Sequence, residues 1–173
     1  MTGGPARRYG WPMIERSEAK PVLVVSACLL GVRCNHRGDA NPSAAVAALA
    51  ATHRLIGVCP ETAGGLATPR PAAERQPDGT VRTVDGADVT AAFARGAEAT
   101  VALARGVGAA GAVLKARSPS CGPGQIYDGS FAKVRVAGDG VTAAALRAAG
   151  VALRSEEDLE PGRWPTSPPP AGR

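Results

Sequence analysis

Short apolar runs alternate along this chain with longer Ala-rich segments. The first run is continuously apolar, without the alternation of a half-exposed strand, which is typical of a strand buried on both faces. Apolar side chains in the longest Ala-rich segment recur every three to four residues, which predicts a helix. We predict β-strands at 21–26, 54–58, 111–115 and 151–154. We predict helices at 43–52, about 88–106 and 141–149.

Turn and cap residues refine this pattern. Asn41 with Pro42 is a typical helix start, and Asp88 or Thr90 is expected to cap the next helix. Asp78-Gly79 predicts a small hairpin at about 73–84, in a region (62–77) otherwise too rich in Gly and Pro for regular structure. The segment 125–136 is ambiguous and is compatible with a hairpin around Asp128-Gly129.

Strands that alternate with helices predict the fold class. Such a chain forms right-handed crossovers and a mainly parallel sheet with helices on both faces. We therefore expect an α/β fold of the Rossmann-like three-layer type, in one domain spanning 21–160. Residues 1–20 and 161–173 are rich in Gly and Pro without apolar periodicity, and are expected to be a disordered extension and a Pro-rich disordered tail.

Composition narrows the function classes. The net charge of +5 is spread along the 173 residues without a basic block, which argues against a nucleic-acid partner. No apolar run is long enough to span a membrane, and the first 20 residues lack the apolar stretch of a signal peptide. A cytoplasmic location is expected, where the four cysteines are reduced and more suited to metal binding or catalysis than to disulfides.

Three cysteines share one setting. Cys28, Cys59 and Cys121 each follow a predicted strand, and each lies close to Gly or Pro. The carboxyl ends of parallel strands meet at one edge of a sheet, so these thiols are able to converge there. Each alone is compatible with inert packing. Together they indicate either a zinc site, with Cys34 as a fourth ligand, or an iron–sulfur cluster with one iron open to substrate; spacing does not choose between them.

Two polar residues adjoin these cysteines. Glu61 lies two residues after Cys59, and Ser118 lies three before Cys121, so both are candidates for acid–base chemistry. Their plainer alternatives are a loop cap for Glu61 and a turn hydroxyl for Ser118. Lys115 and Arg70 are candidates for anion contacts, with ordinary salt bridges as the alternative.

Several motifs together resemble the DUF523 family, which includes iron–sulfur-dependent 2-thiouracil desulfurases. They are SACLLG at 26–31, VCPE at 58–61, GGLATPRP at 64–71, DVTAAFARGA at 88–97, LKARSPSCG at 114–122 and IYDGSF at 126–131. The resemblance implies a [4Fe-4S] cluster held by Cys28, Cys59 and Cys121, with Glu61 and Ser118 as the acid–base pair. Cys34 is left out of the implied ligand set.

The expected function follows from this resemblance. It implies a hydrolytic, non-redox desulfurase that converts C=S to C=O in a small thiolated nucleobase, with sulfur leaving by the open iron. The alternative is a non-catalytic zinc or iron–sulfur module that serves a partner protein. Relatives commonly have an Arg-Tyr-Asp-Gly-like run where this chain has Asn35-His36-Arg37-Gly38, so if this loop lines the pocket, the substrate could differ from thiouracil.

Overall fold

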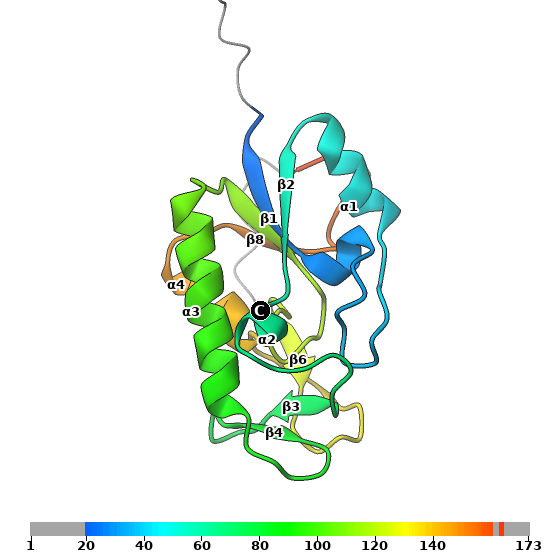
Figure 1. Ribbon diagram of the computed structural model, residues 1–173, viewed down its shortest axis with the longest axis vertical. Coiled ribbons are helices and arrows are strands. Elements are labelled where there is room, and N and C mark those ends of the chain that lie inside the picture. Colours follow the sequence, from blue (N-terminus) through cyan, green and yellow to red (C-terminus); the bar gives the residue numbers. More distant parts are fainter. Residues whose placement is uncertain (1–19, 161–162, 165–173) are drawn as a thin grey trace, which may run out of the picture.

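A four-stranded parallel sheet lies at the centre of the computed structural model (Figure 1). Its strands lie side by side in the order β2 (Arg54–Val58), β1 (Val22–Ser26), β5 (Gly111–Leu114) and β8 (Leu153–Ser155). All three pairings are parallel, which confirms the predicted α/β class. The structure describes residues 20–160 and 163–164. The predicted extension, except Lys20, and most of the predicted tail lie outside these residues, and their disorder stays a prediction.

Helices cover both faces of the sheet because alternate β1 side chains point to opposite sides. Leu23 and Val25 pack with Val46 and Leu49, which belong to α1 (Ala44–Ala48) and the 3₁₀ turn η2 (Leu49–Ala51). Val24 packs on the other face, in a cluster that includes Ala104 of α3 (Thr90–Gly106) and Leu146 of α4 (Val141–Ala148). The three predicted layers are therefore confirmed.

Two antiparallel hairpins complete the domain. The first pairs β3 (Ala73–Arg75) with β4 (Val81–Thr83), and the second pairs β6 (Gln125–Tyr127) with β7 (Arg135–Ala137). The first confirms the Asp78-Gly79 prediction, and the second resolves the ambiguous segment. Both hairpins lie beyond the carboxyl ends of the parallel strands (Figure 1), where they form the far side of the site described below.

The predicted helices are present, but the N-cap positions of α1 and α3 differ from the predicted ones. Asn41 is not an N-cap: its N–H donates to the Cys28 carbonyl at 2.9 Å. Ser43 caps α1 instead and accepts from Val46 N at 3.4 Å. The N-cap position of α3 is Val89 and neither Asp88 nor Thr90, although Asp88 Oδ1 does accept from Thr90 N at 2.9 Å. Thr90 is the first helical residue, and its hydroxyl accepts from Val81 N at 2.9 Å.

Three further elements differ from the prediction. A 3₁₀ turn, η1 (Ala27–Leu30), follows β1 directly, in a stretch expected to be a loop. A four-residue helix, α2 (Pro60–Ala63), begins just before a region expected to be irregular, with Pro60 at its first position, where a missing N–H costs nothing. The last strand begins at Leu153, two residues later than expected. Both short elements place residues of the site.

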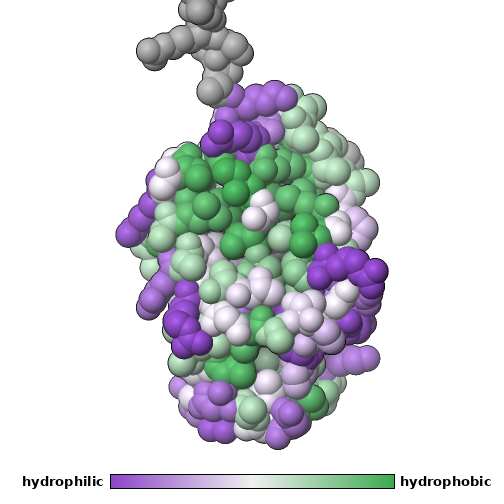
Figure 2. Space-filling model, viewed as in Figure 1, coloured by the Kyte–Doolittle hydropathy of each residue, from purple (hydrophilic) through white to green (hydrophobic). Residues whose placement is uncertain are grey.

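The half of the molecule that contains the parallel sheet has apolar residues at its surface. β2 is an edge strand, and its Leu55 and Ile56 are half-buried. Apolar residues gather over the sheet half of the face in Figure 2, whereas the half that carries β3 and β4 is mixed. Trp164 packs against the cluster around Leu23, with its ring 6.4 Å from that of His53.

Of the helices in the described residues, none combines the length and hydrophobicity that a membrane crossing requires.

Candidate active site

The strand order reverses direction at β1. The chain passes from β1 to β2 on one side, and then returns to β5 on the other side of β1. Ligands of open α/β sheets bind outside the carboxyl ends of the strands at such a switch point. A cavity of about 590 Å³ lies there in this structure.

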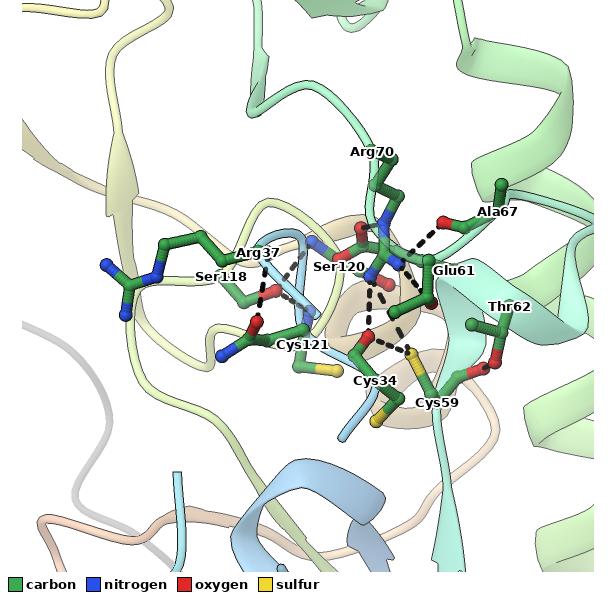
Figure 3. Close-up of polar contacts among 12 residues, drawn as sticks. Cys34, Arg37, Cys59, Glu61, Thr62, Ala67, Arg70, Ser118, Ser120 and Cys121 are labelled. Atoms are coloured by element: carbon green, nitrogen blue, oxygen red, sulfur yellow. Dashed lines mark hydrogen bonds and ion pairs between the residues drawn. The ribbon is translucent and has the colours of Figure 1, made fainter. Parts of the chain in front are cut away.

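All four cysteines of the chain line this cavity. Cys28 lies in η1 directly after β1, Cys59 is the N-cap residue of α2 after β2, and Cys121 lies in the loop after β5. Figure 3 shows the side chains of Cys34, Cys59 and Cys121 turned toward a common space. The structure thus brings together the three predicted ligands and also Cys34.

Burial in the cavity disfavours the charged thiolate form of these cysteines. Burial raises the pKa of the Cys28 and Cys121 thiols. Burial, with the neighbouring Cys59 thiol as a second cause, raises the pKa of Cys34 to about 12. Metal ligation needs the deprotonated thiolate. A positively charged metal centre would stabilise these buried sulfurs as thiolates, so the donor set fits such a group.

Within residues 20–160 and 163–164, no three Cys, His, Asp or Glu side chains are arranged to hold one metal ion.

Glu61 is held by a buried arginine. Its Oε2 accepts from Arg70 Nε at 2.6 Å, and the Glu61 and Arg70 side chains are only 15% and 7% exposed. The same guanidinium donates to the Cys34 carbonyl at 3.0 Å and reaches Cys59 Sγ at 3.9 Å (Figure 3). Arg70 therefore fixes the carboxylate relative to two cysteines, and Glu61 is an ion-pair partner on the cavity wall and not a loop cap.

Ser118 organises the loop that carries Cys121. Its Oγ accepts from Ser120 N at 3.2 Å and from Cys121 N at 3.0 Å. Gly122 N closes the turn onto the Ser118 carbonyl at 2.8 Å, and a Cβ on Gly122 would lie 2.8 Å from that oxygen. The predicted turn hydroxyl is therefore present. Because two N–H groups occupy the acceptor side of Ser118 Oγ, its O–H remains the group to offer to a ligand.

Basic residues at the cavity are mostly paired. Lys115 contacts Glu156, which also accepts from Ala116 N at 2.7 Å. Arg117 forms a two-pronged pair with Glu157. The plainer prediction for Lys115 and Arg70, an ordinary salt bridge, is therefore what the structure contains for both.

Sequence reasoning missed one wall of the cavity. Glu74, Tyr127 and Phe131 line it, from β3, from β6 and from the loop after β6. IYDGSF contributed to the family resemblance, and this was the one signal that pointed to Tyr127 and Phe131. Asn35, His36 and Arg37 also line the cavity, so the loop that departs from the family pattern does border the pocket.

Comparison with known proteins adds independent findings. Residues 23–158 match the family model described as 2-thiouracil desulfurase. The uncharacterized protein YbbK of Bacillus subtilis (strain 168) is 38% identical over 147 residues, which are 80% of this chain and 97% of YbbK. Among solved structures, the [4Fe-4S]-dependent thiouracil desulfidase TudS is similar with a TM-score of 0.75 and 48% identity, over 81% of this chain and 93% of TudS.

Proposed function

This chain belongs to the 2-thiouracil desulfurase family, and on that premise we propose that it hydrolyses the C=S group of a thiolated nucleobase to C=O. The net reaction consumes one water and releases one hydrosulfide and one proton, so it needs no external oxidant or reductant. The observation that carries the proposal is the gathering of four cysteines, Glu61 and Ser118 around one cavity at the switch point of the sheet.

The proposed cofactor is a [4Fe-4S] cluster held by Cys28, Cys59 and Cys121. The support is the donor set described above, together with the [4Fe-4S] dependence that the name of TudS records. When bound, such a cluster supplies an open iron that acts as a Lewis acid for the sulfur of the substrate. The fourth cysteine, Cys34, is not assigned to the cluster.

Glu61 is the proposed proton acceptor for the attacking water. Arg70 contacts its Oε2, so we assign proton transfer to Oε1, the oxygen that Arg70 does not engage. The guanidinium would keep the carboxylate from rotating, and a positioned acid or base contributes about 10²- to 10⁴-fold in rate. The same group would then return the proton to the departing sulfur or to the ring.

Ser118 is the proposed hydrogen-bond donor to the substrate. Two backbone N–H groups hold its oxygen in place, which directs its O–H away from its own loop. It would orient the ring and stabilise charge that develops on a ring heteroatom as water adds. Its loss is expected to cost less than the loss of Glu61, because a hydroxyl orients or relays and does not take the proton itself.

The test is Glu61→Gln in anaerobically prepared protein, measured as iron per chain and as turnover of 2-thiouracil. Gln keeps the shape and reach of Glu61 but removes the titrating group. We expect parent iron content and about 10²- to 10⁴-fold slower turnover, with a smaller loss for Ser118→Ala. Glu98→Gln, at an exposed position of α3, is the matched control and should retain the parent rate.

Two outcomes would contradict the proposal. Parent turnover in Glu61→Gln would mean that this carboxylate does no proton transfer. Colourless wild-type protein with one zinc per chain, and without desulfurase activity, would favour the non-catalytic module instead.

A further inference from the structure

Aromatic side chains are scarce in this chain, yet two of them reach the cavity. The sequence has two residues each of Phe, Tyr and Trp. Phe93 is buried in the domain core, and Trp164 packs against one face of the sheet. Tyr127 and Phe131, both half-buried, line the cavity wall formed by β6 and the loop that follows it. This wall carries none of the four cysteines.

The loop that presents Phe131 has an unusual backbone. Phe131 and Lys133 have left-handed φ angles of 59° and 61°, a conformation that side chains other than glycine rarely adopt. The remaining non-glycine residue with positive φ in the described part of the chain is Arg117, at 60°, and all three line the cavity. Backbone held in such conformations concentrates at functional sites.

A buried carboxylate holds this loop in place. Glu74 of β3 is 8% exposed, and its Oε2 accepts from Gly129 N and from Phe131 N, each at 3.0 Å. Gln76 adds a bond from its Nε2 to the Gly129 carbonyl at 3.2 Å. Hydrogen bonds to an ionised acceptor are stronger than neutral ones. The backbone that carries Phe131 is thus held in place by the protein itself, without a ligand.

An aromatic side chain that lines a cavity from a fixed backbone is suited to stacking on a planar ring. We infer that Phe131, supported by Tyr127, is a specificity-determining residue that stacks on the heteroaromatic ring of the substrate, with Glu74 as its positioning residue. This inference rests on the proposed function and deepens it, because it assigns ring recognition to the hairpin wall and sulfur recognition to the cysteine side. Stacking of a base on an aromatic side chain tolerates different ring substituents, so the wall selects planar rings as a class.

The experiment separates ring contact from sulfur contact. Cluster-loaded wild-type, Phe131→Ala and Phe131→Tyr proteins are compared in kcat and KM for 2-thiouracil, and in the inhibition constant of uracil, which has the ring without the sulfur. We expect Phe131→Ala to raise both KM and the uracil inhibition constant by about 5- to 140-fold, with kcat changed less than twofold. Phe131→Tyr should restore both constants.

Two further variants test the roles within the wall. Val134→Ala truncates a side chain of the same loop that is 49% exposed, and it should leave both constants unchanged. Glu74→Gln should weaken uracil binding, as Phe131→Ala does. The double variant Glu74→Gln/Phe131→Ala should bind uracil no more weakly than Phe131→Ala alone. A loss of iron or of kcat in Glu74→Gln, at unchanged uracil binding, would overturn its positioning role.

The two hypotheses fail in different ways. If the wild type desulfurises 2-thiouracil but Phe131→Ala has parent constants, the inference is wrong and the proposed function stands. If the wild type does not desulfurise, calorimetry with uracil on the cluster-loaded protein still measures the ring contact. Weaker binding by Phe131→Ala would then support the inference alone, and equal binding or no binding would overturn it.

Discussion

The contact between α2 and α3 gives a sharp prediction, because two glycines let these helices touch. A Cβ on Gly96 would lie 2.0 Å from the Pro60 carbonyl oxygen, and a Cβ on Gly64 would lie 2.0 Å from the Ala92 carbonyl oxygen. Pro60 stands between Cys59 and Glu61. Any displacement of α2 therefore moves a proposed cluster ligand and the proposed base together.

The size of the effect of Gly96→Ala follows from this contact. Cβ atoms are essentially never found within 3.0 Å of such an atom, so α2 must move by about 1 Å or more. Overpacking of this kind costs typically about 1–3 kcal/mol in the free energy of unfolding. Ala in place of Gly inside a helix returns up to about 1 kcal/mol. We therefore expect a net decrease in the free energy of unfolding. Because a misplacement of about 1 Å costs roughly 10²-fold in rate, we also expect turnover to fall by about that factor.

Gly106→Ala is the matched control. It makes the same substitution at the end of the same helix, where a Cβ would meet nothing within 4 Å. The assays are urea denaturation under anaerobic reducing conditions, iron per chain, and turnover of 2-thiouracil. The control should have at least parent stability and parent turnover. If Gly96→Ala matched Gly106→Ala in all three measurements, the close approach of α2 to α3 would not position the site, and the reasoning would be refuted.

Two other predictions concern the cluster and the acid sensitivity of the fold. Cys34→Ala should keep its iron after anaerobic preparation while Cys121→Ala loses it; the reverse result would show that the ligand set is wrong. The hydrogen bonds from Arg147 to Asp139, at 2.7 and 2.9 Å, lower the pKa of this carboxyl in the folded chain. Its stabilising effect is therefore complete above the unfolded pKa of about 3.9 and is lost as the pH falls through the lower folded pKa. Asp139→Asn should cost about 1–2 kcal/mol in unfolding free energy at pH 7, and the difference from the parent should shrink below about pH 4; a constant difference down to pH 2 would contradict it.

Local patterns in the sequence determined the elements of the sheet and the location of the reactive residues. Apolar runs and Ala-rich periodic segments encode strands and helices within a window of a few residues, so β1, β5 and α3 were predictable. The Gly and Pro residues near Cys59 and Cys121 mark the ends of strands for the same local reason. Parallel strands share one carboxyl edge, and this general rule was enough to predict a site there.

The short elements were not predicted from the sequence because they have too few residues to show a hydrophobic period. The four residues of α2 are followed by their C-cap Gly64, which packs closely against α3, and no local pattern reveals this contact. Ser43 rather than Asn41 caps α1, and the backbone N–H of Asn41 donates instead to the Cys28 carbonyl. In each case a contact with a distant part of the chain decided between two local possibilities.

The composition of the cavity was decided by tertiary structure. The strand order places Cys28 between the strands that lead to Cys59 and Cys121, and sequence spacing carries no information about that order. The Glu61–Arg70 ion pair depends on the path of a Gly- and Pro-rich loop, and the hydrogen bond that Phe131 N donates to Glu74 joins residues 57 positions apart. Burial turns these contacts into fixed geometry, because a buried polar group must find a partner. The sequence therefore determined which residues could react, and the packing of two hairpins against the edge of the sheet decided what surrounds them.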